Sequence, residues 1–97
     1  MNYSRADYDY MAGARRRAFQ RIAGKLGKDH PVTKMMGGLS HGRHRAEQGP
    51  DGNLRTAVRE MSFLDGYFDC LNLWARDNDP AAQRIMIDEY PHGYEKA

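Results

Sequence analysis

The sequence predicts an all-α fold: a small helical bundle of two long helices, a shorter C-terminal helix and one or two short bridging helices. Apolar residues recur at helical spacing over two long stretches. Serine, aspartate and proline stand where these stretches begin, and glycine or proline stands where they end. No alternation of apolar and polar residues persists as it would along a strand. A chain of 97 residues has room for one compact core, so we expect a single domain over 1–97.

The first helix is expected over about 4–26. Ser4 and Asp7 have the spacing of a capping box, in which each side chain bonds the backbone N–H of the other. Gly27 is a typical residue to end the helix. One face carries an apolar stripe of Tyr8, Met11, Phe19, Ile22 and Leu26.

The middle of the chain predicts only short helical pieces. Asp29-His30-Pro31 resembles a cap followed by proline in the first turn, which predicts a helix over about 31–36. Gly37 and Gly38 end it. Ser40 then begins a second piece over about 40–48, which Gly49-Pro50 closes.

Residues 54–76 give the strongest helical signal. One apolar row consists of Leu54, Ala57, Val58, Met61, Leu64, Phe68, Leu71 and Ala75. A second row on the adjoining face consists of Phe63, Tyr67, Cys70 and Trp74. Either this helix contacts neighbours on more than one side, or Phe63, Tyr67 and Trp74 form a binding surface or dimer seam. We favour burial of Trp74, because a bundle this small needs its aromatic residues in the core.

Asp79-Pro80 begins a last helix over about 80–90, with Ala82, Ile85, Met86 and Tyr90 on its inner face. Pro91 ends it and begins the tail 91–97, of which we expect 92–97 to be mobile.

The charges divide unevenly along the chain. Residues 1–48 carry a formal charge of +6 and residues 49–97 a charge of −4, which gives the net charge of +2. Such asymmetry predicts that a basic surface meets an acidic one, on a nucleic acid, a partner protein or a second copy of the chain.

A basic ridge is predicted on the first helix. Arg17, Arg21, Lys25 and Lys28 share one arc of the helical wheel, and Tyr10 lies on the same arc nearer the N-terminus. Arg43 and Arg45 extend the positive charge into the middle segment. We take these seven residues as the candidate partner-binding set, against the alternative of a merely solvated helix face.

Two charges interrupt the apolar rows. Arg15 lies between Met11 and Ile22 on the first helix, and Asp65 lies within the row of the second long helix. A charge at a core position is tolerated when it is paired. We therefore expect an Arg15–Asp65 pair across the bundle, against the alternative that both reach solvent.

Catalytic and metal chemistry find little support. His41, His44 and Glu47 have the spacing of metal ligands, but no CxxC accompanies them and we predict no metal site. Ser40 and His41 are adjacent and their side chains diverge, so they do not form a nucleophile–base pair. The glycines before Ser40 lack the lysine of a phosphate-binding loop. We therefore expect no enzyme and no cofactor.

The location follows from similar reasoning. Cys70 is the sole cysteine and implies no oxidising compartment. No apolar segment resembles a secretion signal or membrane span, so we expect a cytoplasmic protein without membrane contact.

The function expected from the sequence is that of a small non-enzymatic binding protein. It would be an inhibitor, adaptor or accessory subunit that occupies a surface of a larger protein or nucleoprotein complex, as mobile-element products often do. The alternative is direct nucleic-acid binding through the basic ridge, although the pI of about 8.8 is low for that role. A homo-oligomer formed through the oppositely charged halves is a third reading.

Overall fold

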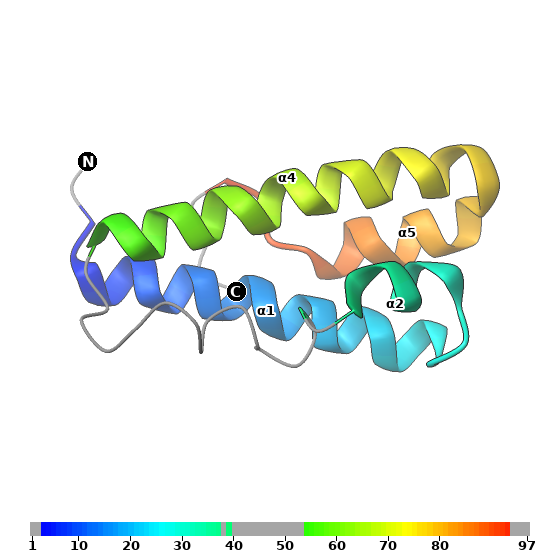
Figure 1. The fold of residues 1–97 in the computed structure, drawn as a ribbon, viewed down its shortest axis with the longest axis horizontal. Coiled ribbons are helices and arrows are strands. Elements are labelled where there is room, and N and C mark those ends of the chain that lie inside the picture. The colour runs from blue at the N-terminus through cyan, green and yellow to red at the C-terminus, as the bar shows by residue number, and fades with distance from the viewer. Residues whose placement is uncertain (1–2, 38, 40–53, 94–97) are drawn as a thin grey trace.

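The computed structural model describes residues 3–37, 39 and 54–93, which form four α-helices and no strand (Figure 1). The helices are α1 (Arg5–Leu26), α2 (Pro31–Met36), α4 (Leu54–Asn78) and α5 (Pro80–Glu89). The predicted all-α class, with two long helices and a shorter C-terminal one, is confirmed. The helical piece predicted over 40–48 lies outside the described residues.

The expected caps hold the ends of α1. The Ser4 hydroxyl accepts from the Asp7 N–H at 3.2 Å, and the Ser4 N–H donates to the Asp7 carboxylate at 2.9 Å. Gly27 ends the helix with a φ of 93°, a conformation that glycine adopts without the strain of a side chain.

The starts of α2 and α5 are joined by one contact. The His30 ring caps α2, because its Nδ1 accepts the Val32 N–H at 3.0 Å. Asp79 caps α5 by accepting the Ala82 N–H at 3.2 Å. The His30 Nε2 lies 2.8 Å from the other Asp79 oxygen, and since Nδ1 is an acceptor, Nε2 carries the ring proton and donates it.

The two long helices run parallel, side by side, and α5 returns antiparallel between them (Figure 1). Contacts between α1 and α4 show their register, because residues four positions apart on one helix contact residues four positions apart on the other: Met11 packs with Met61, and Arg15 pairs with Asp65. The short helix α2 packs on the C-terminal half of α1.

The core lies where α1, α4 and α5 meet. The ring of Tyr90 stacks on Phe68 at 4.1 Å between centroids and lies tilted against Phe19 at 5.4 Å. The main buried cluster comprises Ala18, Phe19, Ile22, Val32, Met36, Leu64, Phe68, Leu71, Ala75, Met86 and Tyr90. A smaller cluster near the start of α1 comprises Met11, Ala12 and Met61.

Two expectations require correction. Val58 was placed in the apolar row of α4 but is exposed, and the buried position beside it belongs to Glu60. The mobile tail does not begin at His92 as expected, because Pro91 before it is buried and the Gly93 carbonyl after it accepts a hydrogen bond from Arg15. These contacts fix the start of that segment against α1 and α4.

Candidate functional site

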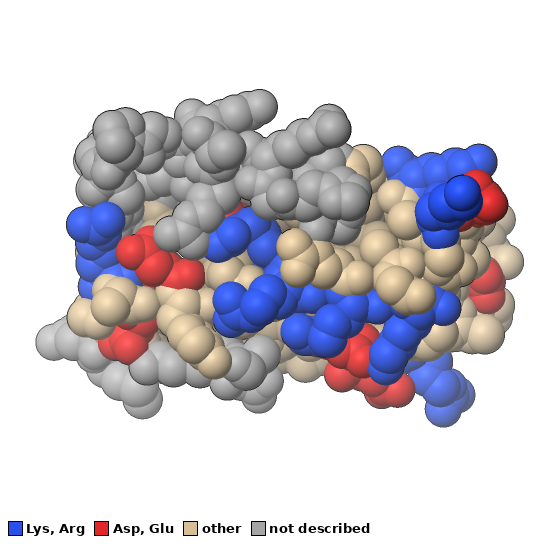
Figure 2. All heavy atoms as spheres, turned by 90° about the horizontal axis from the view of Figure 1, so that it is seen from below, with Lys and Arg blue, Asp and Glu red and all other residues tan. Residues whose placement is uncertain are grey.

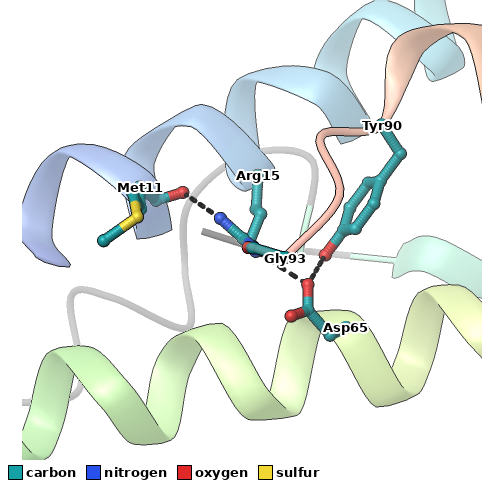
Figure 3. A network of polar contacts seen from close by, with 5 residues as sticks. All are labelled: Met11, Arg15, Asp65, Tyr90 and Gly93. Atoms are coloured by element: carbon teal, nitrogen blue, oxygen red, sulfur yellow. Dashed lines mark hydrogen bonds and ion pairs between the residues drawn. The ribbon is translucent and has the colours of Figure 1, made fainter. Parts of the chain in front are cut away.

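A network of polar contacts centred on Arg15 joins three parts of the chain (Figure 3). The Arg15 side chain is fully buried, and its Nε donates to the Asp65 Oδ1 at 2.7 Å. Its other nitrogens donate to the Met11 carbonyl at 3.0 Å and to the Gly93 carbonyl. The predicted Arg15–Asp65 pair is therefore present, and it also holds the segment after α5.

Tyr90 completes the network. Its hydroxyl donates to the same Asp65 oxygen at 2.7 Å. Burial raises the pKa of Tyr90 well above its ordinary value, and the hydrogen bond to the Asp65 carboxylate adds to the shift. The phenol therefore stays protonated and acts as a permanent donor, so the arrangement is suited to holding helices together rather than to proton transfer.

A second ion pair between α1 and α4 was missed by the sequence analysis. The Arg16 Nε lies 2.7 Å from the Glu60 Oε1, and the Glu60 side chain is only 3% exposed. Glu60 stands one turn from both Ala57 and Leu64 in the buried row, which hints at its burial, but its partner depends on the register of α1 and α4.

The basic ridge lies mainly on the outer side of α1. Figure 2 shows lysine and arginine side chains gathered on this side, with acidic side chains next to them. Arg17, Arg21 and Lys25 are exposed on the helix, and the Arg17 guanidinium lies 5.3 Å from the centre of the exposed Tyr10 ring. Lys28 is exposed too, but it lies in the turn after Gly27, so the helical part of the ridge ends at Lys25.

Glu89 neutralises part of this ridge. Its carboxylate accepts from the Arg21 Nε at 2.8 Å and from the Lys25 ammonium. These two hydrogen bonds hold the pKa of Glu89 below its ordinary value, that from Lys25 being the larger cause. The positive charge without an ion-pair partner in the described part of the ridge is therefore that of Arg17 and Lys28.

The other two members of the candidate set, Arg43 and Arg45, lie outside the described residues. The same holds for Ser40, His41 and His44, so the structure brings none of them to the ridge or away from it.

The aromatic row of α4 divides between core and surface. Trp74 and Tyr67 are half-buried and pack against the main core, and the Tyr67 hydroxyl donates to the Met35 carbonyl. Phe63 is 46% exposed and stacks on Tyr67 at 6.2 Å, while Cys70 is exposed. The row is thus neither wholly core nor wholly free surface.

A pocket of about 420 Å³ opens beside the Arg15 network. Two carboxylates, those of Asp65 and Asp69, face it, and the Asn72 Oδ1 at its wall is buried without a hydrogen-bond partner among the described atoms. Its lining comprises Asp65, Phe68, Asp69, Asn72, Ile87, Tyr90, Pro91, His92 and Gly93. Such a lining suits a cationic group and disfavours a phosphate.

Within the residues that the structure describes, no three histidine, cysteine, aspartate or glutamate side chains are placed to hold a metal ion. None of the helices in the same residues is long and apolar enough to cross a membrane.

Comparison with known proteins adds no relative: no family model, curated protein or solved structure matches the chain.

Proposed function

We propose that the chain is a small non-enzymatic binding protein that attaches to an acidic surface of a larger protein complex through its basic ridge. The proposal rests on the exposed pair of Arg17 and Tyr10, together with the exposed Lys28 in the turn that follows α1. Arginine and tyrosine supply much of the binding energy at protein interfaces, because they combine large contact area with directed polar groups. An inhibitor, an adaptor or an accessory subunit would use such a surface.

A protein partner fits this surface better than nucleic acid does. The Glu89 carboxylate lies within the ridge and would repel phosphates. It also forms ion pairs with Arg21 and Lys25, so their charges are already partly neutralised. A protein can place its carboxylates opposite Arg17 and Lys28 and avoid Glu89. Direct nucleic-acid binding is accordingly the second candidate, supported by the stacking of arginine on an exposed tyrosine.

The test compares two charge-reversed variants of the tagged full-length chain. Arg17→Glu with Lys28→Glu alters the ridge without touching the ion pairs of Glu89. Arg76→Glu with Arg84→Glu, on α4 and α5, changes the net charge equally at exposed positions outside the ridge. Partners are captured from extract of the native cell, with and without nuclease treatment, and identified by mass spectrometry.

We expect a partner that the wild type and the Arg76/Arg84 variant retain and that the Arg17/Lys28 variant loses, with equal circular dichroism for all three. Retention of the same partner by the folded Arg17/Lys28 variant would contradict the proposal. Binding to DNA or RNA that weakens steeply with salt, and capture that nuclease abolishes, would favour the second candidate.

A further inference from the structure

The outer face of α4 carries an apolar stripe that no other helix of the described chain covers. In Figure 1, α1 and α5 both lie on one side of α4, and neither of these helices covers its opposite side. Phe63 is 46% exposed and Leu73 is 52% exposed on that side, and Gly66 and Cys70 are exposed between them. Large apolar side chains beside small ones are typical of a surface into which another helix packs.

The spacing of this stripe is that of a coiled coil. Arg59, Phe63, Gly66, Cys70, Leu73 and Asp77 follow one another at alternating intervals of four and three residues. This is the spacing of the two seam positions of a heptad repeat, here kept over about five turns, or about 27 Å of helix. It differs from the buried row of α4, which faces the opposite way.

The order of residues in the stripe is self-complementary. From either end it reads charge, large apolar residue, small residue, small residue, large apolar residue, charge, and the two end charges have opposite signs. An antiparallel copy centred between Gly66 and Cys70 places Phe63 against Leu73 of the other copy and Arg59 against its Asp77. A parallel copy would instead place Arg59 against Arg59 and Asp77 against Asp77.

We propose that the occupant of this face is a second copy of the chain, packed as an antiparallel α4–α4 pair about a two-fold axis. Such an interface is isologous, so each contact occurs twice. The end charges are available for it: Arg59 is exposed without an ion pair among the described residues, and Asp77 has only its exposed neighbour Arg76 at 3.1 Å. The basic ridge lies on the α1 side, away from this face, so both copies keep it accessible.

The small central residues set how closely the helices approach. A Cβ added to Gly66 would meet no atom within 4 Å, so the space above it is open to the side chain of another copy. One flanking contact is unfavourable, because Asp69 would lie near Asp69 of the other copy. The stripe is short and this repulsion weakens it, so a dimer of micromolar affinity is expected.

Mass measurement by sedimentation, at chain concentrations from about 2 to about 200 µM, tests the proposal. We expect dimerisation in the wild type and at least a tenfold weaker dimer in Phe63→Glu and in Leu73→Glu. Val58→Glu is the matched control, since Val58 is an exposed apolar residue on another side of α4. A wild type that stays monomeric throughout, or a control that weakens the dimer as much as Phe63→Glu, would overturn the proposal.

Charge reversal tests the orientation. Arg59→Glu alone and Asp77→Arg alone each create two like-charged contacts and should weaken the dimer about fivefold, while the double reversal should restore it. Asp69→Asn should strengthen it. Failure of the double reversal to restore dimerisation would exclude the antiparallel register.

A disulfide exchange experiment locates the centre. Cys70 of one copy lies opposite Gly66 of the other, whereas two Cys70 residues lie too far apart to bond. Mixing the wild type with a Gly66→Cys/Cys70→Ser variant under oxidation should therefore give a crosslinked heterodimer, and neither protein alone should crosslink. Replacing the variant by Ser62→Cys/Cys70→Ser should abolish the product. Equal crosslinking in the wild type alone, or with the Ser62 variant, would refute the register.

Discussion

Removing either member of the Arg15–Asp65 pair should destabilise the fold, but by unequal amounts. Arg15 is fully buried, whereas the Asp65 side chain is 40% exposed. Asp65→Ala leaves the buried Arg15 guanidinium with carbonyl partners alone and no opposite charge. We therefore expect the free energy of unfolding to fall by about 3–5 kcal/mol. Arg15→Met retains the aliphatic bulk and leaves a carboxylate that water and Tyr90 can solvate, for about 1–2 kcal/mol.

The double variant Arg15→Met/Asp65→Ala should be less destabilised than the sum of the singles, by about 1–3 kcal/mol, because it leaves no buried charge without a partner. The partial exposure of Asp65 keeps this coupling below that of a fully buried pair. Urea unfolding followed by circular dichroism measures all three free energies, provided that the denaturant slopes agree.

Tyr90→Phe is the matched control, because it removes one hydrogen bond to Asp65 and keeps the ring that stacks on Phe68. Its cost should be about 1.5–3 kcal/mol, as for a hydrogen bond to a charged acceptor. Additive effects of Arg15→Met and Asp65→Ala, each under about 0.5 kcal/mol, would show that the two residues act independently and would refute the network.

Two further predictions concern Glu89 and the aromatic row. Glu89→Gln should lower the free energy of unfolding at pH 7, and the deficit should shrink as the pH falls below 4.5, as measured by urea unfolding at pH 7 and at about pH 3. The folded-state pKa of Glu89 is depressed, so its stabilisation is present above its ordinary pKa of 4.5 and is lost as pH falls through the folded-state value; an equal deficit at both values would contradict this. Trp74→Ala should cost about 1–3 kcal/mol because the ring is half-buried against the core, whereas Phe63→Ala in the monomer should cost under about 1 kcal/mol. Thermal unfolding compares the two, and a larger loss for Phe63→Ala would contradict the division of the row.

Helix boundaries were predictable because they depend on residues close in sequence. The Ser4–Asp7 capping box and the Asp79-Pro80 start both form as expected. The Arg15–Asp65 pair was also predictable, since each charge interrupts an otherwise apolar row and each therefore needs a partner.

Contacts that depend on how the helices align could not be read in the same way. The Arg16–Glu60 pair requires α1 and α4 to be parallel and in one register, and both residues also fit exposed helix positions. Similarly, the contact of Glu89 with Arg21 depends on the return of α5 along α1. The prediction that Lys28 lies on the helical ridge was wrong, because the helical wheel that aligned it with Arg21 was extended past Gly27, where the helix ends.

The uneven division of charge along the chain is partly explained by ion pairs within the fold, which the sequence analysis did not foresee. Arg15, Arg16 and Arg17 are consecutive and look like one basic cluster, but successive helical side chains diverge by about 100°. The first two reach Asp65 and Glu60, and only Arg17 remains on the ridge.

Four ion pairs among the described residues join an arginine or lysine of the first half to an acidic residue of the second: Arg15–Asp65, Arg16–Glu60, Arg21–Glu89 and Lys25–Glu89. Much of the asymmetry is therefore used within the fold, to attach α4 and α5 to α1. The surface that remains for a partner has a modest positive charge beside an exposed tyrosine, which is a weaker attractor for a phosphate backbone than the sequence suggests. A protein partner with a few carboxylates matches it better, and such a partner would gain most from Arg17 and Lys28, which form no ion pair among the described residues.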